Sequence, residues 1–377
     1  MLPKGSTIGI LGGGQLGWML SLAAKDLGYH CHIFAPEENP PAMQAAAHHT
    51  RSGFDNIDEL KTFAKSVNVI TYEFENIPVE PLREIENICA IHPSLKSLEI
   101  CQHRLKEKNF VKDLCISTTP FAEARDVDHL PPIFDIELPT FVKAFQKGRF
   151  FKTLRMGYDG KRQFVIRRRE DASQVPEKLG KGPWIVEVGL DFFQEFAVVV
   201  ARDKGGNTRC FDTIATYHEE GILRKAKIPS GLHPKFETYA QEVAVKIVKK
   251  LEHVGVLTVE FFLLRNINGA EDNDGTNASK RILVNEIAPR VHNSGHLTRE
   301  TCATDQFKQH INAICGLDLG DTTRTKDAVM VNLLGDEVKK WEKPSDDPNT
   351  NVTIYRKGEA RPGRKMGHVV WTQPISR

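Results

Sequence analysis

The chain has 377 residues, enough for two or three domains around a large core. Its formal charge is +2, so it lacks the global basic field typical of nucleic-acid-binding proteins, and it contains no run of about 18 apolar residues that would predict a membrane span. The seven cysteines are scattered and form no CxxC pair. This pattern favours reduced thiols in a cytoplasmic protein over a disulfide framework or a structural zinc site.

The first hundred residues alternate between strand and helix patterns. We expect strands at 7–11, 31–35 and 69–71, with helices at 16–27 and 57–66. Strands that alternate with helices form a parallel sheet with right-handed crossovers. The segment is therefore expected to be a Rossmann-like parallel-sheet unit.

A glycine-rich turn follows the first expected strand. Gly12-Gly13-Gly14-Gln15-Leu16-Gly17 satisfies the G-x-G-x-x-G pattern, and Glu37 follows about 20 residues on. This is the outline of a dinucleotide site, in which N–H groups at a helix N-terminus bind a pyrophosphate. The motif alone has low specificity. Nicotinamide binding is therefore the lesser alternative to a turn with another use, such as holding a substrate phosphate.

The middle of the chain reads as a helix-rich stretch followed by strands. Helices are expected from Ser94 to about Val111 and at about 236–251, and residues 266–280 read as a solvated loop. The expected strands lie near 149–153, 163–167, 184–187, 196–201, 210–215, 254–264 and 281–286, with three more in the tail near 328–334, 351–355 and 366–371.

A polar loop after Lys152 has the composition of a phosphate flap. Gly157 and Gly160 flank Tyr158-Asp159, so the backbone can close over phosphates while Lys152 and Lys161 supply charge. The alternative is a solvated hairpin tip.

Two acids further along suit the rest of a nucleotide. Glu187 is expected at the end of its strand, and Glu195 at the start of the next. Carboxylates of this kind can accept hydrogen bonds from an adenine amine and a ribose, although a strand-end Glu is more often simply solvated.

Two more carboxylates end two β-branched runs. Glu260 ends the run 255–260, and Glu286 ends the run 281–286. Each lies where a strand meets a polar segment, so the two side chains can meet at one end of a sheet. Mg²⁺ takes a carboxylate or two and completes its shell with water and substrate phosphate. The sequence therefore predicts a Mg-nucleotide site beside a cluster of Arg, His and Asn.

Six blocks together resemble the ATP-grasp carboxylases of purine synthesis, and more closely the N5-carboxyaminoimidazole ribonucleotide synthetase family. The resemblance runs in order from the glycine-rich turn to His368, nearly the whole chain. Generic ATP-grasp enzymes share only the Glu260/Glu286 pattern, whereas the fifth and sixth blocks are specific to this branch. The blocks are 71–76, 157–161, 218–223, 255–260, 285–296 and 361–368.

The resemblance implies a fold of mixed α/β and α+β class. A pre-ATP-grasp Rossmann-like domain is expected over residues 1–98, and an ATP-grasp domain over 99–318, with a flap subdomain at about 120–190. A small β-rich C-terminal domain is expected over 319–377.

The resemblance also implies a reaction. ATP, bicarbonate and aminoimidazole ribonucleotide give N5-carboxyaminoimidazole ribonucleotide, ADP and phosphate through carboxyphosphate, in purine biosynthesis. A homodimer and a hand-off of product to a mutase are implied as well. Three alternatives stay open at this point: a related ligase such as a formate-dependent glycinamide ribonucleotide transformylase, a nucleotide-binding scaffold without turnover, and a dehydrogenase misread from the first turn.

Site residues are carried over by the same resemblance. Glu260 and Glu286 are expected to bind Mg²⁺. The expected ATP-binding residues are Arg104, Lys152, Gly157, Tyr158, Asp159, Gly160, Lys161, Arg162, Gln163, Glu187, Val188, Gly189, Leu190, Glu195, His218, Asn285 and Glu286. The expected ribonucleotide-binding residues are Glu75, Tyr158, Asp159, Lys161, Lys357 and Arg364, the last two for the 5′-phosphate.

Arg290, His292 and Asn293 are the candidate catalytic residues, forming a bicarbonate and carboxyphosphate pocket. Arg290 offers a planar fork that matches a carboxylate-like anion. His292 can donate a hydrogen bond or move a proton. The alternative is that Arg290 and His292 brace a turn after Pro289.

The chain departs from the family pattern at six positions. Met156 and Arg162 stand where the family usually has glycine, so we expect the flap to be less flexible or to close differently. Arg356 occupies a position before Lys357 that is frequently glycine. The other departures are Trp18 in place of Arg, His103 in place of Asp and Thr216 in place of Asn.

Overall fold

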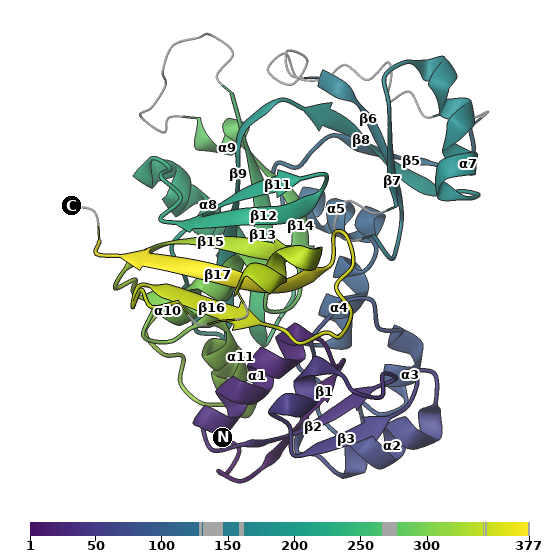
Figure 1. The fold of residues 1–377 in the computed structure, drawn as a ribbon. Helices are drawn as coiled ribbons and strands as arrows, with labels where there is room; N and C mark the ends of the chain where they lie inside the picture. Colours follow the sequence, from purple (N-terminus) through teal and green to yellow (C-terminus); the bar gives the residue numbers. More distant parts are fainter. Residues whose placement is uncertain are drawn as a thin grey trace.

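The computed structural model describes residues 1–127, 130, 146–157, 162–265, 277–341, 343 and 345–375, which form three β-sheets (Figure 1). A parallel sheet lies in the N-terminal segment, a large sheet runs through the centre, and a third sheet lies at the upper right of the view. This arrangement confirms the predicted mixed α/β and α+β class. No helix in the described ranges is both long and apolar enough to cross a bilayer.

The N-terminal sheet has the predicted parallel topology, in the order β3-β2-β1-β4. The structure confirms the expected strands and helices and adds one edge strand, β3. That strand was missed because its sequence, His-His-Thr-Arg, contains no apolar residue. The elements are β1 (Thr7–Leu11), α1 (Gln15–Asp26), β2 (His30–Ala35), η1 (Pro41–Gln44), β3 (His48–Arg51), α2 (Ile57–Lys65), β4 (Val69–Tyr72) and α3 (Val79–Arg83).

The predicted helix-rich stretch is two helices, α4 (Leu95–Cys101) and α5 (Arg104–Asp113), separated by Gln102 and His103. Side chains that accept from the first free backbone N–H groups start both helices. Ser94 accepts from the N–H of Ser97, and His103 accepts from the N–H of Lys106. The Asp that the family pattern has at position 103 would cap the same helix end.

The central sheet has nine strands, in the order β14-β13-β9-β11-β12-β15-β17-β16, with β10 paired to β9. The C-terminal strands therefore continue the sheet through the pairing of β12 with β15. The strands are β9 (Phe192–Arg202), β10 (Thr208–Cys210), β11 (Ile214–Glu219), β12 (Ile222–Ile228), β13 (Gly255–Leu264), β14 (Ile282–Ala288), β15 (Asp327–Leu334), β16 (Thr350–Ile354) and β17 (Lys365–Gln373).

Two helices cover opposite faces of this sheet. Alternate residues of a strand face opposite sides. Val198 and Val200 of β9 join the core under α8 (Pro234–Lys250), whereas Val199 and Ala201 join the core under α11 (Gln306–Cys315). Short elements complete this part of the chain: α9 (Ala278–Arg281), η4 (Asn293–Leu297), α10 (Thr298–Thr301) and η5 (Gly335–Trp341).

The third sheet, in the order β5-β8-β6-β7, belongs to the segment predicted as the flap subdomain. The prediction that Glu187 ends its strand was wrong. The strand continues through the apolar residues Val188 to Leu190, so Glu187 lies in mid-strand, opposite Phe121 and Phe150. The elements are β5 (Phe121–Ala124), β6 (Gln146–Thr153), β7 (Gln163–Ile166), η3 (Arg169–Gln174), α7 (Val175–Leu179) and β8 (Trp184–Leu190).

Two other sequence predictions need comment. The expected strand at 210–215 is two strands, because the pairing on β9 slips by one residue between Cys210 and Ile214. Of the expected loop at 266–280, residues 266–276 lie outside the described residues, and 278–281 form helix α9.

Two buried histidines join the N-terminal segment to the central sheet. The N–H of Val256 donates to Nδ1 of His310, which leaves Nε2 to donate to Oγ1 of Thr71, 2.8 Å away. Nε2 of His253 donates to the carbonyl of Val256, and Nδ1 accepts from Oγ of Ser97 at 2.8 Å. The two bonds that Nδ1 accepts require a neutral imidazole, because a protonated ring has no acceptor nitrogen. The start of β13, the strand that carries Glu260, is thus tied to the N-terminal segment.

This bridge predicts a loss of stability in mild acid. Burial lowers the pKa of His253 and of His310 to about 3, against an ordinary value of about 6.5. The unfolded chain takes up protons first, so the free energy of unfolding falls as the pH drops from about 6.5 towards 3. At about pH 5 the loss is about 2 kcal/mol per histidine. Urea midpoints at about pH 7.5 and pH 5 measure it. We expect His310→Gln to lose less stability over this range than the unaltered chain, and an equal loss would contradict the assignment.

Candidate functional site

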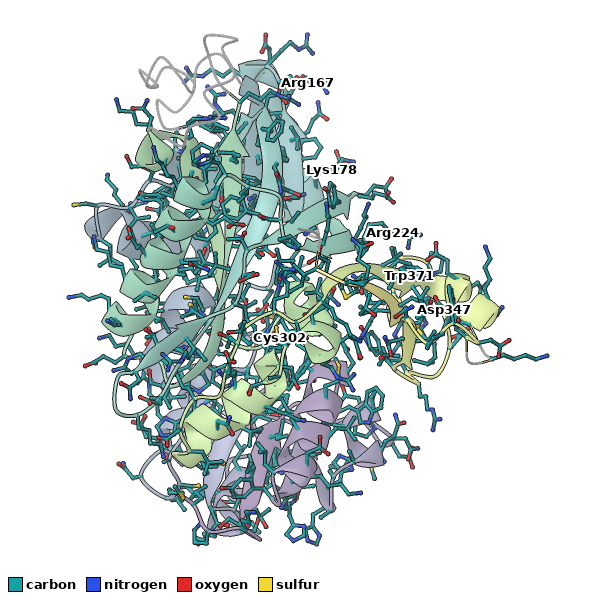
Figure 2. The ribbon with its side chains drawn as sticks, turned by 90° about the vertical axis from the view of Figure 1, so that its left-hand side faces the viewer. Arg167, Lys178, Arg224, Cys302, Asp347 and Trp371 are labelled. Carbon is teal, nitrogen blue, oxygen red and sulfur yellow. The ribbon has the colours of Figure 1, made fainter. Side chains whose placement is uncertain are left out.

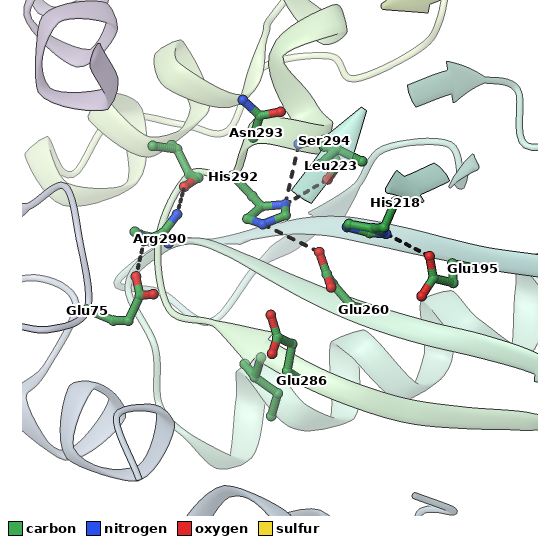
Figure 3. Close-up of polar contacts among 12 residues, drawn as sticks. Glu75, Glu195, His218, Leu223, Glu260, Glu286, Arg290, His292, Asn293 and Ser294 are labelled. Carbon is green, nitrogen blue, oxygen red and sulfur yellow. Dashed lines mark hydrogen bonds and ion pairs between the residues drawn. The ribbon is translucent and has the colours of Figure 1, made fainter. Parts of the chain in front are cut away.

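Glu260 and Glu286 lie directly opposite each other on the antiparallel strands β13 and β14 (Figure 3). The register shifts by one residue just after Glu260. The side chain of Glu260 is 11% exposed, whereas that of Glu286 is 43% exposed. Burial, together with the charge of Glu286, raises the pKa of Glu260 to about 7. The sheet therefore holds two mutually repelling carboxylates, an arrangement that a bound cation would stabilise.

A cavity of about 240 Å³ opens beside this pair. Its apolar surface comes from Phe150, Leu190, Phe192, Leu223 and Phe262. The structure brings most of the predicted nucleotide residues to its wall: Arg104, Lys152, Gln163, Glu187, Val188, Gly189, Leu190, Glu195, His218, Asn285 and Glu286, together with Glu260, His292 and Asn293.

Two lysines share the buried carboxylate of Glu187. Nζ of Lys152 lies 2.9 Å from Oε2 of Glu187, and Nζ of Lys108 lies 3.8 Å from it. Burial alone would raise the pKa of Glu187, but the two lysines lower it to about 2. Lys108 is 2% exposed and also donates to the carbonyl of Asn285 at 2.8 Å. This wall is therefore a fixed cluster of charges.

His218, which also lines the cavity, is a cation. Its Nδ1 lies 2.6 Å from Oε2 of Glu195. Burial opposes the charged imidazole, but the bond to Glu195 and the nearby charge of Glu260 raise the pKa of His218 to about 9. His218 is therefore protonated at neutral pH and donates to Glu195.

A second pocket, of about 50 Å³, adjoins the first. Both pockets are lined by Arg104, Glu286 and His292. Nη1 of Arg104 lies 3.4 Å from Oε2 of Glu286 at this junction. The remaining wall of the second pocket includes Glu75, Glu107, Met156, Gly157 and Arg290. Two small compartments thus meet at one acid, one guanidinium and one imidazole.

His292 points towards Glu260, and Arg290, which lines the second pocket, points towards Glu75 (Figure 3). Nε of Arg290 donates to Glu75 in a close ion pair, and Nη1 donates to the carbonyl of Val291. Nδ1 of His292 accepts from the N–H of Ser294, so Nε2 carries the proton and faces Oε1 of Glu260 at 3.4 Å. Burial and the charge of Arg290 lower the pKa of His292 well below its ordinary value. His292 is accordingly a neutral donor.

The glycine-rich turn is filled by a side chain of the protein itself. The carboxylate of Glu73 accepts from the N–H of Gly14 and, at 2.7 Å, from the N–H of Gly17. Cβ atoms added at Gly12 or Gly14 would lie 2.5–2.6 Å from Glu73. The glycines therefore admit Glu73 to the N-terminus of α1, the place that a dinucleotide pyrophosphate would need.

Some predicted residues lie away from the two pockets or outside the description. Tyr158, Asp159, Gly160 and Lys161 lie outside the described residues. Arg162, Lys357 and Arg364 are not among the residues that line either pocket. Nζ of Lys357 lies 5.3 Å from the ring centroid of Tyr355, and Nη1 of Arg364 donates to the carbonyl of Glu359.

The glycine departures fall at left-handed backbone positions. The φ angle is +62° at Met156, +58° at Arg162 and +54° at Arg356. Side chains bearing a Cβ adopt this region at a cost of roughly 1–2 kcal/mol each, whereas glycine adopts it freely. The backbone therefore keeps the shape of a glycine-containing family at these positions while the residues differ.

Sequence reasoning missed two buried charged residues of the site, Glu107 and Lys108. Lys108 lies in the charged run Arg104-Leu105-Lys106-Glu107-Lys108, which reads as a solvated helix face. Glu107 is 4% exposed and accepts from the N–H of Ile287. One signal was available for both: Val111, with Lys108 three residues earlier and Glu107 four, marks a buried face of the helix.

The fold and the site define an ATP-grasp enzyme. The ATP-grasp domain family matches residues 109–307. The ribonucleotide synthetase preATP-grasp domain family matches residues 5–102, and the phosphoribosylaminoimidazole carboxylase C-terminal domain family matches residues 328–374.

Relatives that match almost the full length of the chain identify the family within the ATP-grasp enzymes. The N5-carboxyaminoimidazole ribonucleotide synthase of Brucella melitensis is 38% identical over 99% of this chain and 98% of its own length. A bifunctional purine synthesis protein of Dictyostelium discoideum is also 38% identical, but the match spans only 37% of that protein and 98% of this chain. The chain belongs to the N5-carboxyaminoimidazole ribonucleotide synthase family.

Solved structures agree with this assignment. An N5-carboxyaminoimidazole ribonucleotide synthetase in complex with ADP has a TM-score of 0.88 at 33% identity and covers 99% of this chain and 93% of its own. The Aspergillus clavatus enzyme, in complex with ADP and 5-aminoimidazole ribonucleotide, has a TM-score of 0.85 at 28% identity and covers 98% of this chain and 94% of its own. The predicted family and ligase class are confirmed, which decides against the dehydrogenase and the formate-dependent transformylase.

Proposed function

We propose that this chain carboxylates 5-aminoimidazole ribonucleotide in purine biosynthesis, consuming ATP and bicarbonate. The observation that carries the proposal is the junction of the two pockets at Arg104, Glu286 and His292. One pocket has the apolar wall and fixed charges that suit a nucleotide. The other has a largely buried guanidinium that suits a small anion. A phosphoryl group passed across the junction joins ATP to bicarbonate.

The chemistry follows from bicarbonate being a poor electrophile. Transfer of the γ-phosphoryl group to a bicarbonate oxygen gives ADP and carboxyphosphate. The exocyclic amine of the ribonucleotide then attacks the carboxyl carbon, phosphate leaves, and the amine gives up a proton. Phosphoryl transfer depends mainly on positioning and charge neutralisation. Arg104 and Lys152 supply positive charge on the two sides of this path.

The nucleotide residues divide by chemistry. We assign the adenine to the edge of β8 from Glu187 to Leu190, where the strand backbone and the Glu187 carboxylate offer hydrogen-bonding groups. We assign the ribose to Glu195 and His218, which already pair with each other. Gly157 to Gln163 would cover the phosphates, and Asn285 would lie at their edge.

Glu260 and Glu286 fit a Mg²⁺ ion. The described residues contain no cluster of three or more acidic, His or Cys ligands. A magnesium ion bound together with nucleotide phosphates needs only one or two carboxylates, and the opposed pair provides two. Burial and, after it, the charge of Glu286 raise the pKa of Glu260, and a cation between the two carboxylates would offset both effects. When bound, the ion would neutralise charge on the transferring phosphoryl group.

Arg290, His292 and Asn293 form the proposed anion pocket. The guanidinium of Arg290 is held by Glu75 through Nε and by the carbonyl of Val291 through Nη1, and Arg290 lines the second pocket. His292 offers a neutral N–H. We assign the ribonucleotide to Glu75, Tyr158, Asp159, Lys161, Lys357 and Arg364. The charge of Lys357 reaches the glycine-rich turn, where it opposes the rise that burial causes in the pKa of Glu73.

The location, oligomeric state, product transfer and domain limits belong to the same proposal. We place the chain in the cytoplasm, whose reducing conditions suit seven free cysteines. The homodimer, the hand-off to a mutase and the domain limits 1–98, 99–318 and 319–377 stay predictions of the family resemblance.

The test is ADP release from the unaltered chain. We expect release that depends on both bicarbonate and 5-aminoimidazole ribonucleotide, measured with a coupled assay in bicarbonate-free buffer to which each is added in turn. ADP release that ignores both additions would refute the proposed reaction.

A further inference from the structure

We propose that Asn332 is a positioning residue that fixes the amide of Asn293 and thereby makes strand β15 part of the site. The inference rests on the proposed function, in which Asn293 belongs to the anion pocket. Asn332 lies in mid-strand in the C-terminal segment, is fully buried, and lines neither pocket. Its sequence context, Met-Val-Asn-Leu-Leu, reads as an ordinary core strand.

Asn332 and Asn293 form a reciprocal pair. Nδ2 of Asn332 donates to Oδ1 of Asn293 at 2.7 Å, and Nδ2 of Asn293 donates to Oδ1 of Asn332 at 3.2 Å. Asn293 is 7% exposed and lines the larger cavity. The residue that reaches the cavity is therefore held from behind by one that does not.

A third contact decides which way both amides face. Nδ2 of Asn332 also donates to the carbonyl of Leu223 at 2.7 Å, and a carbonyl can only accept. The nitrogen of Asn332 must therefore point towards Leu223, which leaves its oxygen to accept from Nδ2 of Asn293. Leu223 itself lines the cavity, so Asn332 connects two of its wall residues.

An ion pair between Arg224 and Glu337 holds the backbone of β15 around Asn332. Nη1 of Arg224 donates to the carbonyl of Asn332 at 2.9 Å, and both terminal nitrogens of Arg224 pair with the carboxylate of Glu337. Glu337 accepts from the N–H of Leu334 at the end of β15. Figure 2 shows Arg224 beside the C-terminal strands. The position of Asn332 is thus set by elements on both sides of it.

The consequence is a defined orientation for Asn293. Without Asn332, the Asn293 amide loses both bonds of the reciprocal pair. Its contact with the hydroxyl of Tyr355 does not fix which end of the amide donates, because a hydroxyl can donate or accept. A misplacement of about 1 Å near reacting groups can cost about 100-fold in rate. Nucleotide binding depends on β8, His218 and the acid pair, which Asn332 does not touch.

A double-mutant cycle tests this role. We expect Asn332→Ala to lower kcat by about 10- to 100-fold while the KM for ATP stays within about threefold. In an Asn293→Ala background, Asn332→Ala should lower kcat by less than about twofold more, because its target is already gone. Equal losses in both backgrounds would overturn the proposal and leave Asn332 a core residue.

The matched control is Asn312→Ala in α11. Asn312 is also a buried asparagine, 8% exposed, but its side chain donates to Gln309 away from the site. It should leave kcat within about twofold of the unaltered chain. If Asn332→Ala does not fold, Asn332→Ser, which keeps a hydroxyl donor for one of the two acceptors, takes its place in the cycle.

Hydrogen exchange separates this proposal from the proposed reaction. In Asn332→Ala, amides in residues 291–297 should exchange at least about tenfold faster, while those in α11 keep their protection. This measurement does not need turnover. Unchanged protection at 291–297 overturns the positioning role even if the enzyme is active, whereas an inactive unaltered chain with the expected exchange pattern refutes only the reaction.

Discussion

Glu286→Gln is expected to lower ATP- and bicarbonate-dependent turnover by about 1000-fold, equivalent to about 4 kcal/mol of transition-state stabilisation. The substitution keeps the shape of the side chain but removes one of the two carboxylates that face each other across β13 and β14. It also deprives Arg104 of its partner at the junction of the pockets. The measurement is the coupled ADP assay over a range of Mg²⁺ concentrations.

The fold should survive this change. The charge of Glu286 adds to burial in raising the pKa of both Glu260 and Glu107, so its removal relieves repulsion in the cation-free protein. We expect the free energy of unfolding to stay within about 1 kcal/mol of the unaltered value. Glu252→Gln is the control, since Glu252 is an exposed acid paired loosely with Lys96 at 3.9 Å. Near-normal rates in Glu286→Gln would rule out the metal assignment.

The sequence indicated the acid pair because each acid follows a run of apolar β-branched residues, and it placed both acids at strand ends. That placement was wrong, because β13 continues beyond Glu260 to Leu264 and β14 continues beyond Glu286 to Ala288. An acid after such a run is visible without any knowledge of strand pairing. The one-to-one register of the two acids is a property of the sheet, and only the structure gives it. Arg290, His292 and Asn293 were accessible for the same reason, since they follow Glu286 within a few residues.

The supporting residues were hidden because their signal depends on contacts far along the chain. Lys108 lies 177 residues from the Asn285 carbonyl that it binds. Asn332 lies 39 residues from Asn293 and 109 from Leu223. Each looks ordinary in its local sequence, one as a charged helix face and the other as one polar residue in a core strand. Residues that act by holding other residues leave little local pattern.

The glycine-rich turn shows a different limit of prediction from sequence, because one pattern suits two different anions. The pattern correctly indicated an anion at the N-terminus of α1, but the anion belongs to the protein. Glu73 follows β4, and its side chain folds back onto the turn. The sequence of residues 12–17 alone cannot indicate this contact. A phosphate pattern and an internal carboxylate cap require the same free N–H groups, so they share one sequence signature.

Arg290→Lys is expected to lower bicarbonate-dependent ADP release by about 100-fold with little change in the KM for ATP. Lysine keeps the positive charge beside Glu75 but has one nitrogen in place of three. It can pair with Glu75 or bind a planar anion, and it cannot do both with the geometry of a fork. The pair with Glu75 is largely buried, with side-chain exposures of 15% and 19%. The retained charge should therefore keep stability within about 1 kcal/mol of the unaltered chain.

A second pair of variants separates anion binding from the bracing of a turn, the alternative reading of Arg290. Arg290→Met leaves Glu75 without its cation, so the free energy of unfolding should fall by about 3 kcal/mol. At present Arg290 overcomes the effect of burial and lowers the pKa of Glu75. Without Arg290, burial raises that pKa, so the lost stability should return in part as the pH falls and Glu75 takes up a proton.

Glu75→Gln combined with Arg290→Met should regain stability at neutral pH. If Arg290 were only a brace, turnover of this double variant would return to the level of Glu75→Gln alone. If Arg290 binds the anion, the protein is stable and the turnover stays lost.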